Sequence, residues 1–408
     1  MDNIFSEGRI SALPGSPFVR LRALLQNTHP AKDEISLALG EPKHAPPQFV
    51  LDALKNTHDY DRYPPIQGIP ELRAAIEAWL VRRFHLESAM FAQDTQILPL
   101  NGTREGLFLA TQLGPTKPNG AILMPNPFYQ VYAAAAIAAH AEPVYLPTTE
   151  QTGFLPDLDA IAPELLDRCQ SFFICSPANP QGAVASRAYL TKLVELARRH
   201  KFLLLVDECY SEIYDRSEEN APPPSVLEVL SPDTIKDAPV IAFHSLSKRS
   251  NLPGLRSGFC VGGEQAMAQF ANIRQVAGPQ SPIPAQRAAA LAWADDQHVV
   301  ENRALYHQKF DLAEKILGNE HGFFRPAGGF FLWLNVGDGE AATLSLWRDE
   351  GIRVLPGAYL TQNTTNTSSQ IGDAFIRVAL VSPFEQTQIA LERLKSGLDN
   401  FANQKAQS

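Results

Sequence analysis

The sequence is poor in cysteine and in cationic side chains, and each shortage excludes a class of protein. Four cysteines occur among 408 residues, none in a CxxC pair, so we expect buried, reduced thiols. The 35 Lys and Arg residues are outnumbered by 44 Asp and Glu. The net charge of −9 argues against nucleic acid or an anionic membrane as a partner. MDNIFSEGRI at the amino terminus lacks the basic and apolar segments of a signal peptide, so we expect a cytoplasmic protein.

Long apolar runs and several common catalytic motifs are also missing. The longest nearly uncharged stretch, at 120–147, is interrupted by Pro125 and Pro127 and does not predict a membrane span. The chain contains no GxGxxG, no GxxxxGKS/T, no HExxH and no GxSxG. These absences remove the sequence support for a dinucleotide enzyme, a P-loop NTPase, a zinc protease and a serine hydrolase, and we predict no metal site.

What the chain does contain is a series of short apolar runs that alternate with helix-like stretches. Several runs show no polar alternation, which is typical of strands buried on both faces of a parallel sheet. The segments at 71–84 and 189–200 have apolar residues at helical spacing. The pattern predicts an α/β fold with a doubly wound, mostly parallel sheet. The predicted strands lie at 96–100, 121–124, 143–146, 171–175, 202–206, 240–243 and 259–261.

The pattern changes near Pro284, which suggests a second domain. A long helical region at 285–316 leads into FFRPAGGFFLWLNV, a further apolar run at 375–380 and a final helix after Phe384. The polar stretches at 220–225 and 361–370 are predicted surface loops. The predicted units are a segment at 1–45 that packs with the smaller domain, a large domain at 46–285 and a smaller α+β domain at 286–408.

The strongest chemical signal is HSLSKRSNLPGLRSG at 244–258. Lys248 comes just after an apolar run, Ser245 and Ser247 flank it, and Arg256 follows eight residues later. An amine beside hydroxyls and a guanidinium suits a Schiff base with an aldehyde that carries a phosphate. A lone lysine is more often a solvated loop residue, but that interpretation leaves the serines and the arginine unexplained.

Two other apolar runs end in polar residues. Asp207 follows LLLV, and the carboxyl ends of strands are where an open α/β sheet binds ligands. A carboxylate there can hold a ring nitrogen protonated, with Tyr210 turning back to the same ligand, although capping of the next helix explains Asp207 about as well. In CSPANPQG, Asn179 can bond a ligand oxygen, whereas an ordinary turn would also account for this sequence.

Two further segments suit a phosphorylated ring. NGTREG at 101–106 follows an apolar run and opens a helix, whose N–H groups bind phosphate well, but a capped helix without ligand has the same pattern. Tyr129 in PNPFYQVY can stack on a flat ring, although core packing is the commoner use of such a tyrosine. We expect at least one of the bonds Asn126–Pro127 and Asn179–Pro180 to be cis.

Together and in this order, these motifs resemble the class I and II aminotransferases, which are pyridoxal 5′-phosphate (PLP) enzymes of fold type I. The resemblance extends over nearly the whole chain and includes GEPKHAPP at 40–47, YPPIQGIPELR at 63–73, PAGGFFLW at 326–333 and Arg377 in FIRVAL. It implies an aspartate aminotransferase-like fold with a large PLP domain and a smaller α+β domain. It also implies a homodimer, because Tyr63 of one subunit would reach the cofactor of the other.

The resemblance implies roles for the matched residues around the cofactor. Lys248 would form the Schiff base and act as base and acid, and Asp207 would pair with the ring nitrogen. Tyr210, also taken as catalytic, and Asn179 would bond the ring O3′. Tyr129 would stack on the ring face. The residues that would hold the phosphate are Gly102, Thr103, Arg104, Ser245, Ser247, Arg256 and, across the dimer, Tyr63.

The resemblance also implies how the substrate is held. Arg377 would bind its α-carboxylate, helped by Asn179 and the backbone of Gly40. GEPKH and SLSKRSNLPGLRSGF are similar to bacterial N-succinyl-LL-2,6-diaminopimelate aminotransferases of lysine biosynthesis, which transfer the amino group to 2-oxoglutarate. Such a donor carries several carboxylates, so nearby cationic residues are candidate ligands, although each alone is better explained as a surface charge. They are Arg20, Arg22, Lys43, His44 and Arg104.

Other activities on the same cofactor stay open. IRQVAGPQSPIPAQR at 273–287 departs from the succinyl-diaminopimelate group. An aspartate, alanine or aromatic aminotransferase therefore fits the cofactor motifs equally well, and a PLP-dependent C–S lyase is a further alternative. A transcription regulator with an aminotransferase-like domain is disfavoured by the acidic charge and by the absence of an added DNA-binding module.

Overall fold

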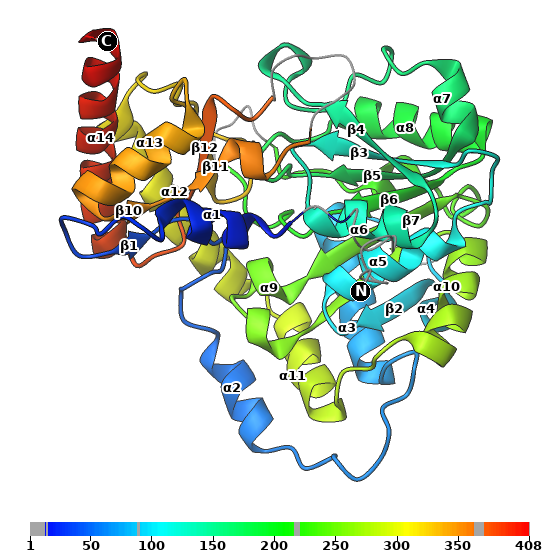
Figure 1. The fold of residues 1–408 in the computed structure, drawn as a ribbon. Coiled ribbons are helices and arrows are strands. Elements are labelled where there is room, and N and C mark those ends of the chain that lie inside the picture. Colours follow the sequence, from blue (N-terminus) through cyan, green and yellow to red (C-terminus); the bar gives the residue numbers. More distant parts are fainter. Residues whose placement is uncertain (1–12, 14, 88–89, 216–220, 363–370, 408) are drawn as a thin grey trace, which may run out of the picture.

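A seven-stranded sheet forms the centre of the larger domain in the computed structural model, which describes residues 13, 15–87, 90–215, 221–362 and 371–407 (Figure 1). Its strand order is β2-β8-β7-β6-β5-β3-β4. Strand β8 runs antiparallel to both neighbours, and the other pairs are parallel. The seven predicted runs form these strands, so the doubly wound α/β prediction is confirmed. Their bounds are β2 Ile97–Leu100, β3 Ala121–Asn126, β4 Glu142–Pro147, β5 Cys169–Cys175, β6 Leu203–Asp207, β7 Val240–Ser245 and β8 Gly258–Gly262.

Both faces of this sheet are covered by helices, which explains why its strands lack polar alternation. Alternate residues of one strand enter different cores. In β6, Leu204 and Val206 belong to the core on one face, whereas Leu203 and Leu205 belong to the core on the other. Helices α3 (Pro70–Phe84), α8 (Arg187–His200) and α11 (Ile283–Ala294) cover the first face, and α5 (Thr103–Ala110), α6 (Gln130–Ala138) and α10 (Glu264–Ala277) cover the second.

The smaller domain, on the left of Figure 1, has its own core around a three-stranded antiparallel sheet in the order β11-β12-β9. Helices α12 and α14 pack against each other beside it. The elements are α12 Gln297–Leu317, β9 Phe331–Asn335, α13 Gly339–Ser345, β10 Ile352–Arg353, β11 Leu355–Pro356, β12 Phe375–Ala379 and α14 Phe384–Gln407. The remaining helices of the large domain are α2 Gln48–Lys55, α4 Gln93–Gln96, α7 Pro163–Arg168 and α9 Leu246–Arg249.

The amino-terminal segment lies with the smaller domain. Strand β1 (Ile35–Ser36) pairs in parallel with β10, and Leu21 and Leu25 of helix α1 (Pro17–Leu25) pack in one cluster with Trp333. Helix α11 lies beyond residue 285, where we expected the large domain to end. It nevertheless belongs to the large-domain core, because its buried apolar face, with Trp293, packs against α2 and α3.

Backbone and surface details complete the comparison with the sequence. The bonds Asn126–Pro127 and Asn179–Pro180 are both cis, which confirms that expectation, and Ser176–Pro177 is cis as well. The four cysteines form no disulfide. The predicted loop at 361–370 lies mostly outside the described residues, as does the start of the one at 220–225. In the described part of the chain, no helix is both long and apolar enough to cross a membrane.

Candidate active site

A cavity of about 510 Å³ lies at the carboxyl edge of the central sheet. Cys175, Asp207 and Ser245 line it at the ends of β5, β6 and β7, which are parallel and finish at one edge. Of the predicted site residues, Gly102 and Tyr63 do not line this cavity. The predicted residues that do are Gly40, Thr103, Arg104, Tyr129, Asn179, Asp207, Tyr210, Ser245, Ser247, Lys248, Arg256 and Arg377.

Lys248 presents its amine to the cavity from the short helix α9. That helix starts where β7 ends, and the Ser245 Oγ caps it by accepting a hydrogen bond from the Ser247 N–H at 3.1 Å. The Lys248 Nζ donates to the Gly40 carbonyl at 2.6 Å. Burial lowers the pKa of Lys248 to about 8, and the Arg377 charge acts in the same direction, against the opposing effects of Cys209, Glu41 and Asp207. An amine with such a pKa is partly neutral near pH 7 and can act as a nucleophile.

Asp207 is buried at the end of β6, where two donors meet its carboxylate. The Tyr132 Oη donates to Oδ2 at 2.8 Å, and the Cys209 N–H donates to Oδ1 at 3.2 Å. Burial raises the pKa of Asp207, and these hydrogen bonds oppose the rise. Burial raises the pKa of Tyr132 far above its usual value, so this hydroxyl stays a donor. Sequence analysis missed Tyr132, because an aromatic residue in PNPFYQVY looks like ordinary core.

Gly102 and Arg256 form a tight cradle beside the cavity. Gly102 has φ +80°, and a Cβ built on it would lie 2.1 Å from the Arg256 Nη2. Arg256 itself has φ +55°, and its carbonyl accepts a hydrogen bond from the Ser281 Oγ at 3.2 Å. Thr103 then opens α5, and the start of a helix offers unpaired N–H groups that suit an anion. The guanidinium, the helix start and the hydroxyls of Ser245 and Ser247 suit the phosphate of PLP.

Arg377 is buried on β12 without an acidic partner in the described part of the chain. Its Nη2 donates to the Ala38 carbonyl at 2.7 Å and its Nη1 to the Asn179 Oδ1 at 3.3 Å, whereas its Nε has no partner. The guanidinium also lies over the Phe331 ring at 4.4 Å. Burial lowers its pKa to about 10, so it remains charged at neutral pH. A buried cation with unused donors suits a carboxylate ligand.

Among the cationic candidates for substrate binding, Arg104 lines the cavity and the other four do not. The Arg104 Nε donates to the Tyr129 Oη at 2.5 Å. Arg20 instead lies over the Tyr359 ring at 3.9 Å. His44 is held by Asn302 and Lys309 through its two ring nitrogens. Sequence proximity to a motif did not separate these cases, because only the fold decides which side chains face the cavity.

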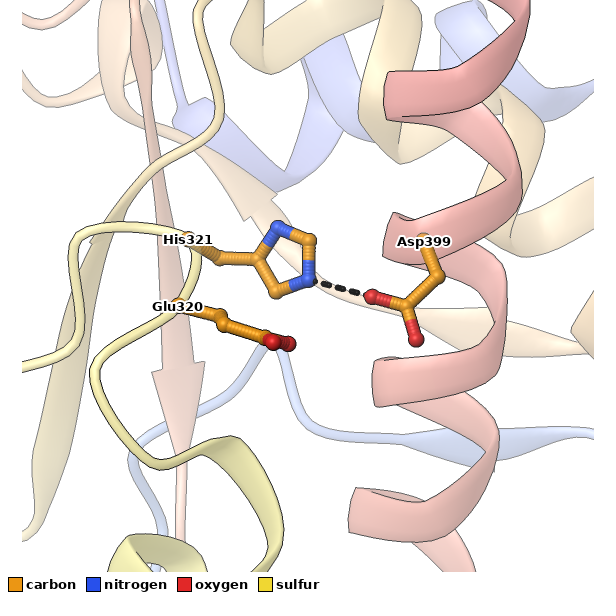
Figure 2. Close-up of side chains that lie close together, drawn as sticks. All are labelled: Glu320, His321 and Asp399. Carbon is orange, nitrogen blue, oxygen red and sulfur yellow. Dashed lines mark hydrogen bonds and ion pairs between the residues drawn. The ribbon is translucent and has the colours of Figure 1, made fainter.

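A second polar cluster, shown in Figure 2, lies in the smaller domain outside the residues that line this cavity. Glu320, His321 and Asp399 bring three possible metal-ligand atoms within 4.8 Å of one another. The His321 Nε2 lies 2.9 Å from the Asp399 Oδ1. Lys395 contacts the carboxylates of both Glu320 and Asp399. Since an ammonium group already neutralises this cluster, it is an ion-pair network between α14 and the turn after α12 and carries no metal assignment.

Comparison with known proteins identifies the family. The model for aminotransferase class I and II matches residues 32–394. The chain belongs to this family. It is therefore a PLP-dependent aminotransferase, as the motifs implied.

Relatives and solved structures agree with that assignment. The LL-diaminopimelate aminotransferase of Aquifex aeolicus (strain VF5) is 30% identical over 399 residues, which are 95% of this chain and 98% of the relative. The 4-dedimethylamino-4-oxo-anhydrotetracycline transaminase OxyQ of Streptomyces rimosus is 32% identical over 363 residues, or 88% and 92%. An aminotransferase structure from Neisseria meningitidis Z2491 is 35% identical with a TM-score of 0.87, and the match covers 95% and 98% of the two chains.

Proposed function

We propose that this aminotransferase holds PLP on Lys248 and moves an amino group from a diaminopimelate-type donor to 2-oxoglutarate in lysine biosynthesis. N-succinyl-LL-2,6-diaminopimelate is the first candidate donor. LL-diaminopimelate is the second, because a relative that is 30% identical over nearly its whole length carries that name. The observation that carries the proposal is the meeting of the Lys248 amine, the Asp207 carboxylate and the Arg377 guanidinium in one cavity.

The residues of the cavity fit the cofactor and its chemistry. When bound, PLP supplies an aldehyde for the amino group and a ring that takes up electrons from the substrate. Asp207 would keep a proton on the ring nitrogen, and Tyr210 and Asn179 would bond the ring hydroxyl. Once released by the incoming amino group, Lys248 would take the Cα proton of the substrate and return it. Arg377 would orient the α-carboxylate so that the Cα–H bond faces this amine.

Two cations at different places in the cavity favour a donor with more than one carboxylate. Arg377 is buried under Phe331, whereas Arg104 is exposed and lines the cavity from the start of α5. Bonding to Tyr129 uses only the Nε of Arg104, so its terminal nitrogens remain available for a second anionic group. A donor held by its α-carboxylate on Arg377 would place a second carboxylate at Arg104, and alanine has no second carboxylate. This arrangement supports a dicarboxylic donor, such as a diaminopimelate derivative, over alanine.

We also propose a homodimer in the cytoplasm. Tyr63 is 97% exposed in the segment after α2, which lies along the lower edge of the molecule in Figure 1. Tyr60 in the same segment and Val276 on α10 are also exposed apolar side chains. A partner subunit would cover such side chains, and Tyr63 would then reach the cavity of that partner.

The absence of disulfides among the four cysteines supports the proposed location in a reducing compartment, the cytoplasm.

The deciding experiment follows the absorbance of bound PLP while single amino donors are added without an acceptor. We expect the two diaminopimelate derivatives to bleach the absorbance faster than aspartate, alanine or phenylalanine, with one oxo acid formed per site. Lys248→Ala should carry no borohydride-fixed cofactor and transfer no amino group. Release of pyruvate, ammonia and thiol from cystathionine would instead identify a C–S lyase. Wild-type turnover by Lys248→Ala would contradict the proposal.

Arg104→Gln tests the proposed donor class. Loss of the distal clamp should raise the KM for N-succinyl-LL-2,6-diaminopimelate about tenfold, the scale of one charged hydrogen bond, and leave the KM for alanine unchanged. Arg22→Gln is the matched control, because Arg22 is an exposed arginine of α1 that does not line the cavity. Steady-state kinetics with both donors decide the result. An equal rise of KM for both donors would show that Arg104 serves the cofactor phosphate instead.

A further inference from the structure

A chain of partly buried hydrogen bonds runs from helix α12 to the backbone of Lys248. Lys309 of α12 is 1% exposed, and its Nζ lies 2.6 Å from the His44 Nε2 and donates to the Leu380 carbonyl at 3.1 Å. The His44 Nδ1 lies 2.8 Å from the Asn302 Oδ1. The Asn302 Nδ2 in turn donates to the carbonyls of Lys248 and Arg249, at 3.4 and 3.3 Å.

Each hydrogen bond in this series is donated in the direction from Lys309 toward the Lys248 backbone. The Asn302 Oδ1 only accepts, so the His44 Nδ1 that faces it carries the proton, and the His44 Nε2 accepts from the Lys309 amine. The Asn251 Nδ2 also donates to the Asn302 Oδ1, at 3.0 Å, which fixes the orientation of that amide. Burial and the Lys309 charge lower the pKa of His44 to about 4, against its bond to Asn302, so the ring is neutral at physiological pH. Burial and the nearby Lys43 lower the pKa of Lys309 to about 7.

His44 closes a loop whose other end lies in the active cavity. Four residues earlier, the Gly40 carbonyl accepts the hydrogen bond from the Lys248 Nζ. A Cβ on Gly40 would lie 2.4 Å from the Phe331 ring, so the loop is packed tightly against the small domain there. Whenever the Lys248 amine is free, it fixes one end of the loop at 40–44, and His44 fixes the other end. Both ends are thus tied to Lys248. The Gly40 end contacts the Lys248 amine, and the His44 end is linked through Asn302 to the carbonyls of Lys248 and Arg249.

We propose that His44, oriented by Lys309 and Asn302, is a positioning residue that holds the loop at 40–44 in register with Lys248. The role rests on the function proposed above, in which Gly40 and Lys248 serve substrate and proton transfer. The Tyr306 ring, 4.7 Å from the His44 ring, packs against the histidine. Without the imidazole bonds the loop would lose its tie to α12, and the Gly40 backbone would no longer keep a fixed separation from the amine.

The kinetic test compares full-length, PLP-loaded variants. His44→Phe keeps a ring but removes both hydrogen bonds, Lys309→Met removes the ammonium, and His44→Gln can still accept from Lys309 and donate to Asn302. We expect the first two to slow half-transamination about tenfold and His44→Gln to recover most of the rate. PLP affinity should change by less than about twofold, because the network does not touch the phosphate cradle.

His307→Phe is the matched control. His307 lies on the same helix and bonds the large domain through its Nε2, 2.8 Å from the Tyr214 carbonyl, but does not reach the loop at 40–44. Equal rates for His44→Phe and His307→Phe would overturn the proposal. A wild-type protein that transfers no amino group from any donor would overturn the proposed function itself, and the two failures are thus distinguishable.

A second measurement does not depend on activity. In ¹⁵N-histidine spectra of the full-length wild type, His44 should stay neutral with its proton on Nδ1 down to about pH 5, and Lys309→Met should raise its pKa by removing the neighbouring cation. The missing signal of His44→Gln assigns the resonance. A His44 ring that titrates near the usual histidine pKa would show that the hydrogen-bond chain is absent and would overturn the proposal, even if His44→Phe fails to fold.

Discussion

At the scale of single residues, the site contains buried ionisable groups that form no ion pair and can therefore still bind or react with a ligand. Lys248 bonds a neutral carbonyl, and Arg377 has no carboxylate partner in the described chain. Each retains a reactive or binding capacity that an ion pair would have used. Of the two, Lys248 has the pKa nearer neutrality, so its protonation changes over the physiological pH range.

The first prediction concerns the capture of PLP by Lys248. The pKa of this amine is lowered to about 8, so its neutral, reactive fraction rises with pH up to that value. We expect the rate of PLP capture by the cofactor-free protein to rise between about pH 6 and pH 8 and then to level off. Because the unfolded chain keeps this proton to higher pH, the same group should also add stability as pH rises from about 8 to about 10. Stopped-flow absorbance measures the first effect, and a rate independent of pH across this range would contradict it.

Predictability at this scale depended on whether a residue belongs to a motif. Lys248 and Asp207 were singled out because each follows an apolar run, whereas Arg377 came only from the family resemblance. Tyr132 and Lys309 were missed, since their partners Asp207 and His44 are far away in the sequence. Nothing local distinguishes Lys309 in an amphipathic helix from a solvated lysine. The proposed roles of the motif residues remain predictions.

At the scale of elements, the turn between β2 and α5, which contains Gly102, is constrained by contact with Arg256 in the segment just before β8. The positive φ of Gly102 and its contact with Arg256 mean that two strand ends approach closely only because one side chain is absent. The approach places the start of α5 beside the guanidinium. Geometry of this kind makes the cradle sensitive to a single methyl group.

Gly102→Ala should therefore weaken PLP binding strongly. The added methyl group would displace Arg256, and because φ +80° with ψ 149° is a conformation almost exclusive to glycine, the strain should cost about 1–3 kcal/mol of the free energy of unfolding. Gly254→Ala is the matched control, because a Cβ on Gly254, in the turn just before Arg256, meets nothing within 4 Å. Fluorescence titration with PLP and thermal unfolding report the two effects. Equal PLP affinity in both variants would refute the cradle.

Strands were predictable at this scale and helix boundaries less so. Buried parallel strands leave uninterrupted apolar runs, and all seven were recovered. The region at 285–316, read as one long helical stretch, is divided into α11 and α12 near Asp295. The Asp295 carboxylate accepts a hydrogen bond from the His298 N–H at 3.0 Å, a capping contact that the apolar spacing does not reveal. Strand β1 has two residues and is formed only by its pairing with β10.

At the scale of the whole molecule, we expect a second subunit to complete each active site. Tyr63 does not line the cavity of its own chain and is almost fully exposed. If Tyr63 serves the cavity of a partner, each site takes Lys248 from one subunit and Tyr63 from the other. Tyr63→Ala and Lys248→Ala then remove groups that different subunits contribute to one site. The sequence could suggest this only through the family resemblance, because composition and periodicity carry no signal for which surface is shared.

Mixing the two defective variants tests this arrangement. After unfolding and refolding together, hybrid dimers contain one site with an intact Lys248 and an intact Tyr63 from the other chain. We expect activity well above that of either variant refolded alone. Samples mixed without refolding serve as the control. Activity no higher than the sum of the two parents would place Tyr63 outside the partner's site.

The reversed strand β8 places the proposed phosphate cradle in a different domain from the proposed carboxylate ligand Arg377. Because β8 runs against its neighbours, Arg256 precedes it at the same edge where β2 and β7 finish, so the anion cradle belongs wholly to one rigid sheet. Arg377 and Gly40 belong to the other domain. If that domain tilted, the oxo acid would leave and the next reactant would enter while the prosthetic group stayed bound to the sheet. Retention of the coenzyme and exchange of metabolites would then be independent of each other.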